Sequence, residues 1–327
     1  MDSFDIINFF FMAVIAATPL LFGTLGEILT QKSGSLNLGV EGMMFMGAAA
    51  GIAASYSYES IAGDAMIGGI SALLAVTAGF LAGALGGFIY SVLTVTLRAN
   101  QNVTGLALTI FGIGAGNLVG EMLGMRAGGF TTIGESTKLW FSGIDWPLSN
   151  IPVVGRLFFS YNFMVYLAVL TAIILMFVFN KTRMGLNLRG VGENPATADA
   201  VGINITRYKY LAASIGGGIC ALGGVYISMA DNLGTWIFNC IAGRGWIAVA
   251  LVIFAAWRPS RAIIGALLFG GLSVLRLYLP IEGVPAQVYN ILPFIATILV
   301  LIFTSIRQSK EHSQPKSCGT NYFREDR

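Results

Sequence analysis

Apolar stretches separated by short polar segments recur along almost the whole chain. A helix needs about 20 consecutive apolar residues to cross the hydrocarbon core of a bilayer. Nine stretches approach or exceed this length: 6–29, 40–56, 66–97, 103–124, 161–180, 207–231, 244–257, 261–279 and 286–306. The stretch 66–97 is long for a single helix, and the stretch 244–257 is short. The pattern therefore predicts an all-α polytopic membrane bundle of about eight to ten transmembrane helices over residues 1–306, and a polar, disordered tail over 307–327.

Composition supports a membrane protein. Hydrophobic residues make up 55% of the chain, charged residues 11%, and the mean hydropathy is +0.75, whereas a soluble domain carries about 25% charged residues. Glycine is abundant, with 42 residues, and small residues let membrane helices approach closely. The three cysteines, Cys220, Cys240 and Cys318, show no paired or metal-binding spacing, so we expect no metal site.

The distribution of basic residues predicts an orientation. Cytoplasmic loops of membrane proteins carry an excess of lysine and arginine. With nine spans and the C-terminus inside, the inner segments hold fourteen of the 19 basic residues. The outer loops hold only Arg126, Lys138 and Arg156, and Arg244 and Arg276 lie at or within spans. We therefore expect the N-terminus outside the cell, the C-terminus inside, and a cytoplasmic segment at about 181–209.

Catalytic and nucleotide-binding motifs are missing from the sequence. There is no G-x-x-x-x-G-K-[ST], no H-E-x-x-H and no G-x-S-x-G. The one histidine, His312, lies in the polar tail. We therefore expect no enzyme activity and no cofactor in this chain. Four carboxylates, Glu27, Glu41, Glu121 and Asp231, lie in or near apolar spans, so an ion-coupled carrier stays open as an alternative.

A polar island, "RMGLNLRGVGENPATADAVGINITRYKY" (183–210), lies between two apolar spans. Asn194 and Pro195 suit a helix start, with proline in the first helical position, and Gly202 can end that helix. A short polar helix here would give a separate ATPase a cytoplasmic foothold. The alternative is an ordinary cytoplasmic loop that obeys the rule on basic residues.

A second polar interruption, "SGSLNLGVEG" (33–42), contains Asn37 and Glu41. Irregular backbone at membrane depth is tolerated only where protein shields it or where it lines a wet cavity. Broken helices of this kind often mark a translocation path. A plain cytoplasmic turn, with Glu41 near the headgroups, explains the pattern equally well.

Four further residues are candidates for a substrate path, each with a structural alternative. Asn102 could instead cap the helix that begins near Val103. Asn117 could form a hydrogen bond between helices. Arg244 could bond to Glu41 or to a neighbouring carbonyl, because an arginine in a span needs a partner. Trp246 could stack its ring on a cargo or simply pack between helices.

Three segments together resemble one known family. They are "GEILTQKSGSLNLGVEGMM" (26–44), "GLNLRGVGENPATADAVGIN" (185–204) and "GRGWIAVALVIFAAWRP" (243–259). In order and spacing they resemble the membrane permeases of bacterial ABC importers for branched-chain amino acids, simple sugars and nucleosides, over about residues 10–305. The first and third look most like the shorter of the two paired nucleoside permeases. The sequence departs from that pattern at Gly190, where alanine is frequent, and at "AAWRP".

The resemblance implies a fold like that of the type II, vitamin B12-type importers, in the bacterial cytoplasmic membrane. It implies an ABC ATPase subunit that holds ATP and magnesium, a second, paralogous permease, a substrate-binding lipoprotein and surrounding membrane lipid as partners, and no nucleic acid. The cargo would be a nucleoside, with a simple sugar or riboflavin as alternatives. The residues that would couple to the ATPase are Gly185, Arg189, Gly192, Glu193, Asn194, Pro195, Ala198 and Gly202.

Overall fold

The computed structural model describes residues 6–143, 149, 151, 153–279, 285–307 and 314–323. Within these ranges the regular structure is helical, apart from one isolated antiparallel bridge between Thr132 and Thr235. The helices are α1 (Ile6–Lys32), α2 (Val40–Ala62), α3 (Gly68–Ser91), α4 (Gln101–Arg126), α5 (Glu135–Phe141), α6 (Val154–Phe158), α7 (Phe163–Lys181), α8 (Arg183–Glu193), α9 (Pro195–Ala200), α10 (Ile205–Tyr226), α11 (Arg244–Phe254), α12 (Pro259–Tyr278) and α13 (Ala286–Arg307). Single-turn segments also occur at Gly63–Ala65, Val92–Thr96 and Ile227–Asp231.

Each of the nine predicted spans is a helix in the part of the chain that the structure describes. The all-α membrane bundle is therefore confirmed. By length and composition six of these helices can cross a membrane. The long run predicted at 66–97 is α3 continued by the π-helical turn Val92–Thr96. The short run at 244–257 is α11, which has only 11 residues.

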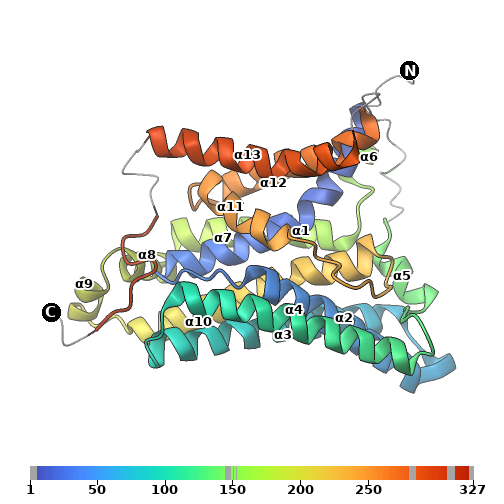
Figure 1. The fold of residues 1–327 in the computed structure, drawn as a ribbon, viewed down its shortest axis with the longest axis horizontal. Coiled ribbons are helices and arrows are strands. Elements are labelled where there is room, and N and C mark those ends of the chain that lie inside the picture. The colour runs from blue at the N-terminus through green and yellow to red at the C-terminus, as the bar shows by residue number, and fades with distance from the viewer. Residues whose placement is uncertain are drawn as a thin grey trace.

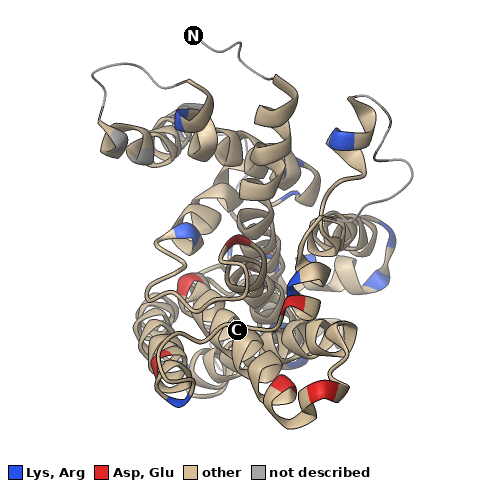
Figure 2. Cartoon of the chain, turned by 90° about the vertical axis from the view of Figure 1, so that its right-hand side faces the viewer, with Lys and Arg blue, Asp and Glu red and all other residues tan. Residues whose placement is uncertain are grey.

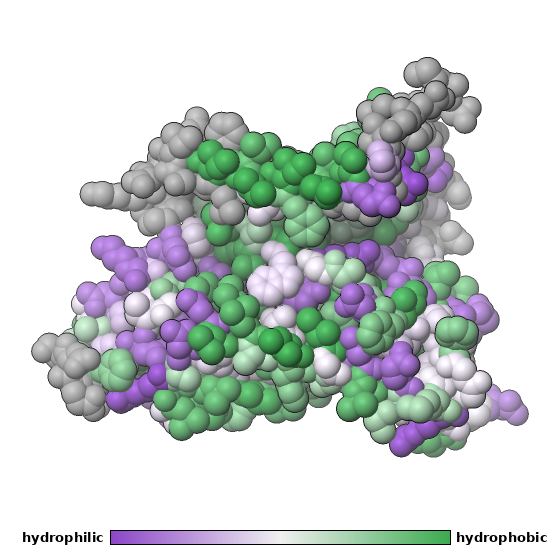
Figure 3. Space-filling model, viewed as in Figure 1, coloured by the Kyte–Doolittle hydropathy of each residue, from purple (hydrophilic) through white to green (hydrophobic). Residues whose placement is uncertain are grey.

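The long helices run side by side along the longest axis of the molecule (Figure 1). The helices α8 and α9 and the C-terminus lie at one end, on the left of Figure 1, and the N-terminus, α5 and α6 lie at the other. Hydrophilic residues gather toward both ends of the long axis, the α8–α9 end included, whereas α13 presents a hydrophobic surface (Figure 3). A view onto the opposite end shows few charged residues along the ribbons (Figure 2). This distribution is typical of a bundle embedded in lipid.

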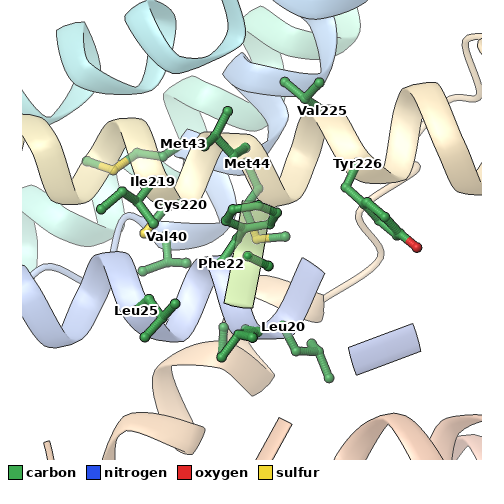
Figure 4. Close-up of a cluster of buried hydrophobic side chains, with 14 of the residues drawn as sticks. Leu20, Phe22, Leu25, Val40, Met43, Met44, Ile219, Cys220, Val225 and Tyr226 are labelled. Carbon is green, nitrogen blue, oxygen red and sulfur yellow. The ribbon is translucent and has the colours of Figure 1, made fainter. Parts of the chain in front are cut away.

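The core is organised around α10, which packs against α1, α2 and α3. Glycines permit this close approach, because a Cβ on Gly26 of α1 would lie 2.3 Å from the carbonyl oxygen of Gly216, and a Cβ on Gly83 of α3 would lie equally close to that of Gly217. Larger side chains from α1, α2 and α10 fill the remaining space (Figure 4). Among them, Phe22 is fully buried. Backbone-to-backbone packing of this kind suits a lipid environment, where burial alone does not hold helices together.

Part of the C-terminal tail is folded, which differs from the expected disorder of 307–327. Residues 314–323 lie against the α8–α9 end. The hydroxyl of Ser317 donates to the carbonyl of Gly192 at 2.6 Å. The amide of Asn321 donates to the carbonyl of Arg98 at 2.6 Å, and the hydroxyl of Tyr322 bonds to the carboxylate of Asp199 at 3.0 Å. Polar composition predicted disorder, but here the polar groups bond the tail to the backbone at Gly192 and Arg98 and to the side chain of Asp199.

Candidate functional site

The polar island forms two short helices, α8 and α9, at one end of the bundle (Figure 1). The hydroxyl of Thr182 accepts the N–H of Gly185 at 3.1 Å and starts α8. The carboxamide oxygen of Asn194 accepts the N–H of Thr197 at 3.0 Å, and Pro195 occupies the first turn of α9. Gly202, with φ of +84°, ends the turn after α9. The predicted helix start and stop are therefore confirmed.

An open groove of about 630 Å³ lies between α8 and α9. Arg189, Glu193 and Asn194 line it, and all three side chains are exposed. The guanidinium of Arg189 also donates to the carbonyl of Phe179, which ties α8 to the end of α7. The island therefore presents charge of both signs to a partner.

Ala198 contributes little surface to this groove. It is 3% exposed and packs in a small cluster with Val191 and Ile205. The exposed apolar side chains of the island are Met184, Leu186 and Val201 instead. Sequence reasoning missed Met184 and Leu186, although apolar residues that recur within a short polar segment are a usable signal for a docking surface.

Gly192 joins the island to the interior of the bundle. A Cβ at this position would lie 2.3 Å from the carbonyl oxygen of Lys32, the last residue of α1. Gly185 has a similar role at the α7 junction, where a Cβ would lie 2.2 Å from the carbonyl oxygen of Val178. The backbone of α8 therefore packs directly against the segment between α1 and α2.

The segment 33–39 between α1 and α2 runs buried within the bundle, and this decides the question left open by the sequence. Asn37 is 1% exposed. Its carboxamide oxygen accepts the N–H of Gly39 at 2.8 Å, and its own N–H donates to the carboxylate of Glu27 at 3.2 Å. The interruption is therefore irregular backbone shielded by protein. The side chain of Asn37 stabilises the turn into α2.

A series of buried side-chain hydrogen bonds connects the end of α1, next to this interruption, to the segment 243–259. The amide of Gln31 donates to Glu27 at 2.8 Å, and its oxygen accepts the indole N–H of Trp257 at 2.6 Å. Glu27 is fully buried, and its second carboxylate oxygen has no partner among the described residues. The segments 26–44 and 243–259 thus contact each other, although more than 200 residues separate Gln31 from Trp257.

Glu41 binds backbone and not a side chain. Its carboxylate accepts the N–H of Gly243 at 2.8 Å and that of Gly245 at 2.6 Å. The carboxylate therefore caps the first turn of α11, where the unpaired N–H groups and the helix dipole favour a negative charge. The expected bond between Glu41 and the guanidinium of Arg244 is absent from the described contacts. Arg244 pairs with Asp231 at 3.1 Å instead.

The remaining candidates divide into structural and accessible residues. Asn117 is 8% exposed and accepts the N–H of Asn239 at 3.1 Å, so it anchors the segment before α11. The cap of α4 is Asn100, whose side chain accepts the N–H of Val103 at 3.1 Å. The suggestion that Asn102 caps this helix is wrong, because α4 begins at Gln101 and Asn102 already lies within its first turn. Asn102 itself is exposed.

Trp246 and Arg244 keep access to solute or lipid. Trp246 is 38% exposed. Arg244 lines a cavity of about 450 Å³ between α1, α11 and α12, together with Asp231, Asn232 and Ser273. The side-chain nitrogen of Asn232 has no partner among the described residues. Of the residues that the sequence singled out for the path, the structure thus leaves Asn102, Arg244 and Trp246 accessible.

Gln101 is a structural residue that sequence reasoning missed. Its side-chain oxygen accepts the N–H of Leu36 at 2.7 Å, and its nitrogen donates to the carbonyl of Thr320 at 3.1 Å. It therefore joins the interruption, α4 and the tail. A glutamine at the start of an apolar helix is too common to be a signal.

Comparison with known proteins gives whole-length matches. The family described as "Branched-chain amino acid transport system / permease component" matches residues 9–301. A protein of Haloferax volcanii, named provisionally as a glucose ABC transporter permease, is 34% identical over 95% of this chain and 96% of its own length. A nucleoside ABC transporter permease of Lactococcus lactis is 33% identical over 95% of each chain. A guanosine ABC transporter permease of Bacillus subtilis is 32% identical over 92% of this chain and 93% of its own.

Proposed function

The chain belongs to the branched-chain amino acid transport system permease family, and from that premise we propose that it is the membrane-spanning subunit of an ATP-driven nucleoside importer. It is a multi-pass membrane protein. The observation that carries the nucleoside assignment is the similarity, over nearly the full length of both chains, to a nucleoside permease and a guanosine permease. A simple sugar is the second candidate, because the glucose relative is equally similar.

The α8–α9 element is the proposed docking site of a separate ATPase. Three observations support it: the charged groove, the exposed apolar side chains of Met184, Leu186 and Val201, and the contact between Gly192 and the end of α1. Closure of an ATPase dimer would move α8. Through the contact at Gly192, this movement would also displace the segment 33–39 before α2. The chain transmits this motion only insofar as the ATPase states bind the two permease states with different affinity.

The remaining parts of the assembly follow from the same proposal. The α8–α9 end faces the cytoplasm, which agrees with the excess of basic residues in the inner segments. A second permease subunit covers part of the exposed apolar surface of α3 and α4. A substrate-binding lipoprotein delivers the cargo at the end that carries α5 and α6. ATP and magnesium bind to the ATPase and not to this chain.

The cavity beside Arg244 and Asp231 is the proposed contact point for the cargo within this subunit. An ion pair and two amide or hydroxyl groups on an otherwise apolar wall suit a neutral, hydroxyl-rich solute. Contacts here need only be weak, because the binding lipoprotein supplies the selection.

Reconstitution with the partner subunits in proteoliposomes tests the proposal. We expect uptake of a radiolabelled nucleoside that requires ATP and the binding lipoprotein and is insensitive to collapse of proton and sodium gradients. Glucose in place of the nucleoside is the matched comparison for the second candidate. Uptake by this chain alone, driven by an ion gradient, would show a secondary carrier instead.

A further inference from the structure

A second cavity, of about 490 Å³, lies next to α9 at the same end of the bundle. Three segments that are distant in sequence form its wall: the turn after α3, the stretch from the end of α9 into α10, and the C-terminal tail. The volume is within the range of small-molecule sites, about 300–1,000 Å³. Neither the transport path nor the docking groove includes this cavity.

Lys209 lines this cavity, and no acidic side chain among the described residues pairs with it. It is 3% exposed, and no hydrogen bond or ion pair to its ammonium exists within the part of the chain that the structure describes. The side chain is buried while its ammonium faces the cavity, and an ammonium that has lost most of its water is stabilised by an anionic partner. The one acid on the wall, Asp199, is bonded to the hydroxyl of Tyr322. The buried charge therefore indicates an anion that completes the site.

The first turn of α10 adds a second, independent feature. Asn204 caps this helix by accepting the N–H of Arg207 at 3.0 Å. The N–H groups of Ile205 and Thr206 have no acceptor among the described residues, and both residues line the cavity. The N-terminus of a helix with such groups attracts anions.

Arg98 brings a further cation to the wall, and the tail holds it in place. Its guanidinium lies over the ring of Phe323, 4.8 Å from the ring centroid, and its carbonyl accepts the amide of Asn321. The backbone at Arg98 has a φ of +58°, an uncommon conformation for a non-glycine residue. The folded tail and this turn together close one side of the cavity.

We propose that this cavity binds a phosphate group, held between the Lys209 ammonium, the Arg98 guanidinium and the first turn of α10. Donors from three directions match the several acceptor oxygens of a phosphate. The cavity is larger than a phosphate ion, so the group is carried by a larger molecule, which is either an anionic lipid headgroup or a soluble phosphorylated metabolite. Binding would also order the tail, since Asn321 and Tyr322 belong to the wall.

Thermal unfolding of the full chain in phosphatidylcholine nanodiscs tests the site, with inorganic phosphate titrated at constant ionic strength. We expect phosphate to raise the Tm of the wild type. Lys209→Met should weaken the apparent phosphate affinity by about tenfold or more, since it removes one charge-assisted contact. Lys316→Met is the matched control, because Lys316 is exposed at the same end and does not line the cavity. Arg98→Gln provides the same comparison should Lys209→Met not be recovered folded.

The source of the phosphate is distinguished by replacing part of the phosphatidylcholine with phosphatidylglycerol. A lipid site predicts that phosphatidylglycerol raises the Tm of the wild type without added phosphate, and that Lys209→Met removes this increase. A site for a soluble ligand predicts that inorganic phosphate or adenosine monophosphate raises the Tm of the wild type and that phosphatidylglycerol does not. The site is refuted if neither probe stabilises the wild type, or if Lys209→Met responds to both as the wild type does.

Discussion

The carboxylate of Glu41 and the backbone N–H of Gly245 are 2.6 Å apart, and they join the start of α2 to the start of α11 inside the bundle. A Cβ on Gly245 would lie 2.5 Å from the Cα of Glu41. The two helices can therefore meet only because position 245 is glycine. The first turns of α2 and α11 thus lie next to each other, and the Glu41 carboxylate of α2 caps α11.

Removal of this cap should destabilise the protein. We expect Glu41→Ala to lower the free energy of unfolding by about 2 kcal/mol, because two N–H groups at the start of α11, those of Gly243 and Gly245, lose their acceptor. Glu41→Gln keeps one acceptor oxygen and should lose less. Thermal unfolding in nanodiscs measures both, with the exposed Glu121→Ala as control. An unfolding temperature equal to that of the control would show that Glu41 does not cap α11.

Two glycines two residues apart on α8 should respond oppositely to alanine. A Cβ at Gly192 meets the carbonyl of Lys32, whereas nothing lies within 4 Å of a Cβ at Gly190. Gly192→Ala should cost about 2 kcal/mol from overpacking, and Gly190→Ala should stabilise the helix by about 0.5–1 kcal/mol. The two unfolding temperatures decide this, and equal shifts would contradict the contact.

The indole of Trp257 should contribute to stability through its N–H. Trp257→Phe keeps the ring but leaves the oxygen of Gln31 without a donor, at a cost of about 1–3 kcal/mol. The exposed Trp140→Phe is the matched control. In a double-mutant cycle with Gln31→Leu the two effects should not add, because they remove the same bond. Full additivity would show that the bond contributes nothing.

Substitutions on the island should separate docking from folding. Glu193→Arg and Val201→Asp alter exposed side chains, so we expect normal amounts of folded protein but loss of ATP-dependent uptake in the reconstituted complex. Glu121→Arg, at the far end of α4, is the charge-reversal control. Normal uptake in both variants would remove the α8–α9 element from the ATPase interface.

Ala198→Asp should act differently from these surface variants. Ala198 is buried beside Val191 and Ile205, so a carboxylate there would lose its water without gaining a partner. We expect loss of folded protein, seen as a broad elution profile in detergent and not as uncoupling. A well-folded but uncoupled Ala198→Asp would show that this side chain reaches the partner.

Local features were predictable from the sequence because their causes lie within a few residues. The apolar length of each span predicts a membrane helix without reference to any other segment. The pair Asn194 and Pro195 and the glycine at 202 define α9 by the same logic, since caps act within one turn. Each of these elements is present.

Partners across long sequence distances were decided only by the tertiary structure. The sequence showed that Glu41, Asn117 and Arg244 were polar groups in an apolar setting, which must find partners because lipid offers none. It could not show that Glu41 binds the backbone at Gly245, or that Asp231 takes Arg244, because several partners satisfy the same need and helix packing selects among them. The folded tail has the same cause: its polar groups predict solvent exposure, and only the arrangement of α3, α8 and α9 supplies acceptors that hold it.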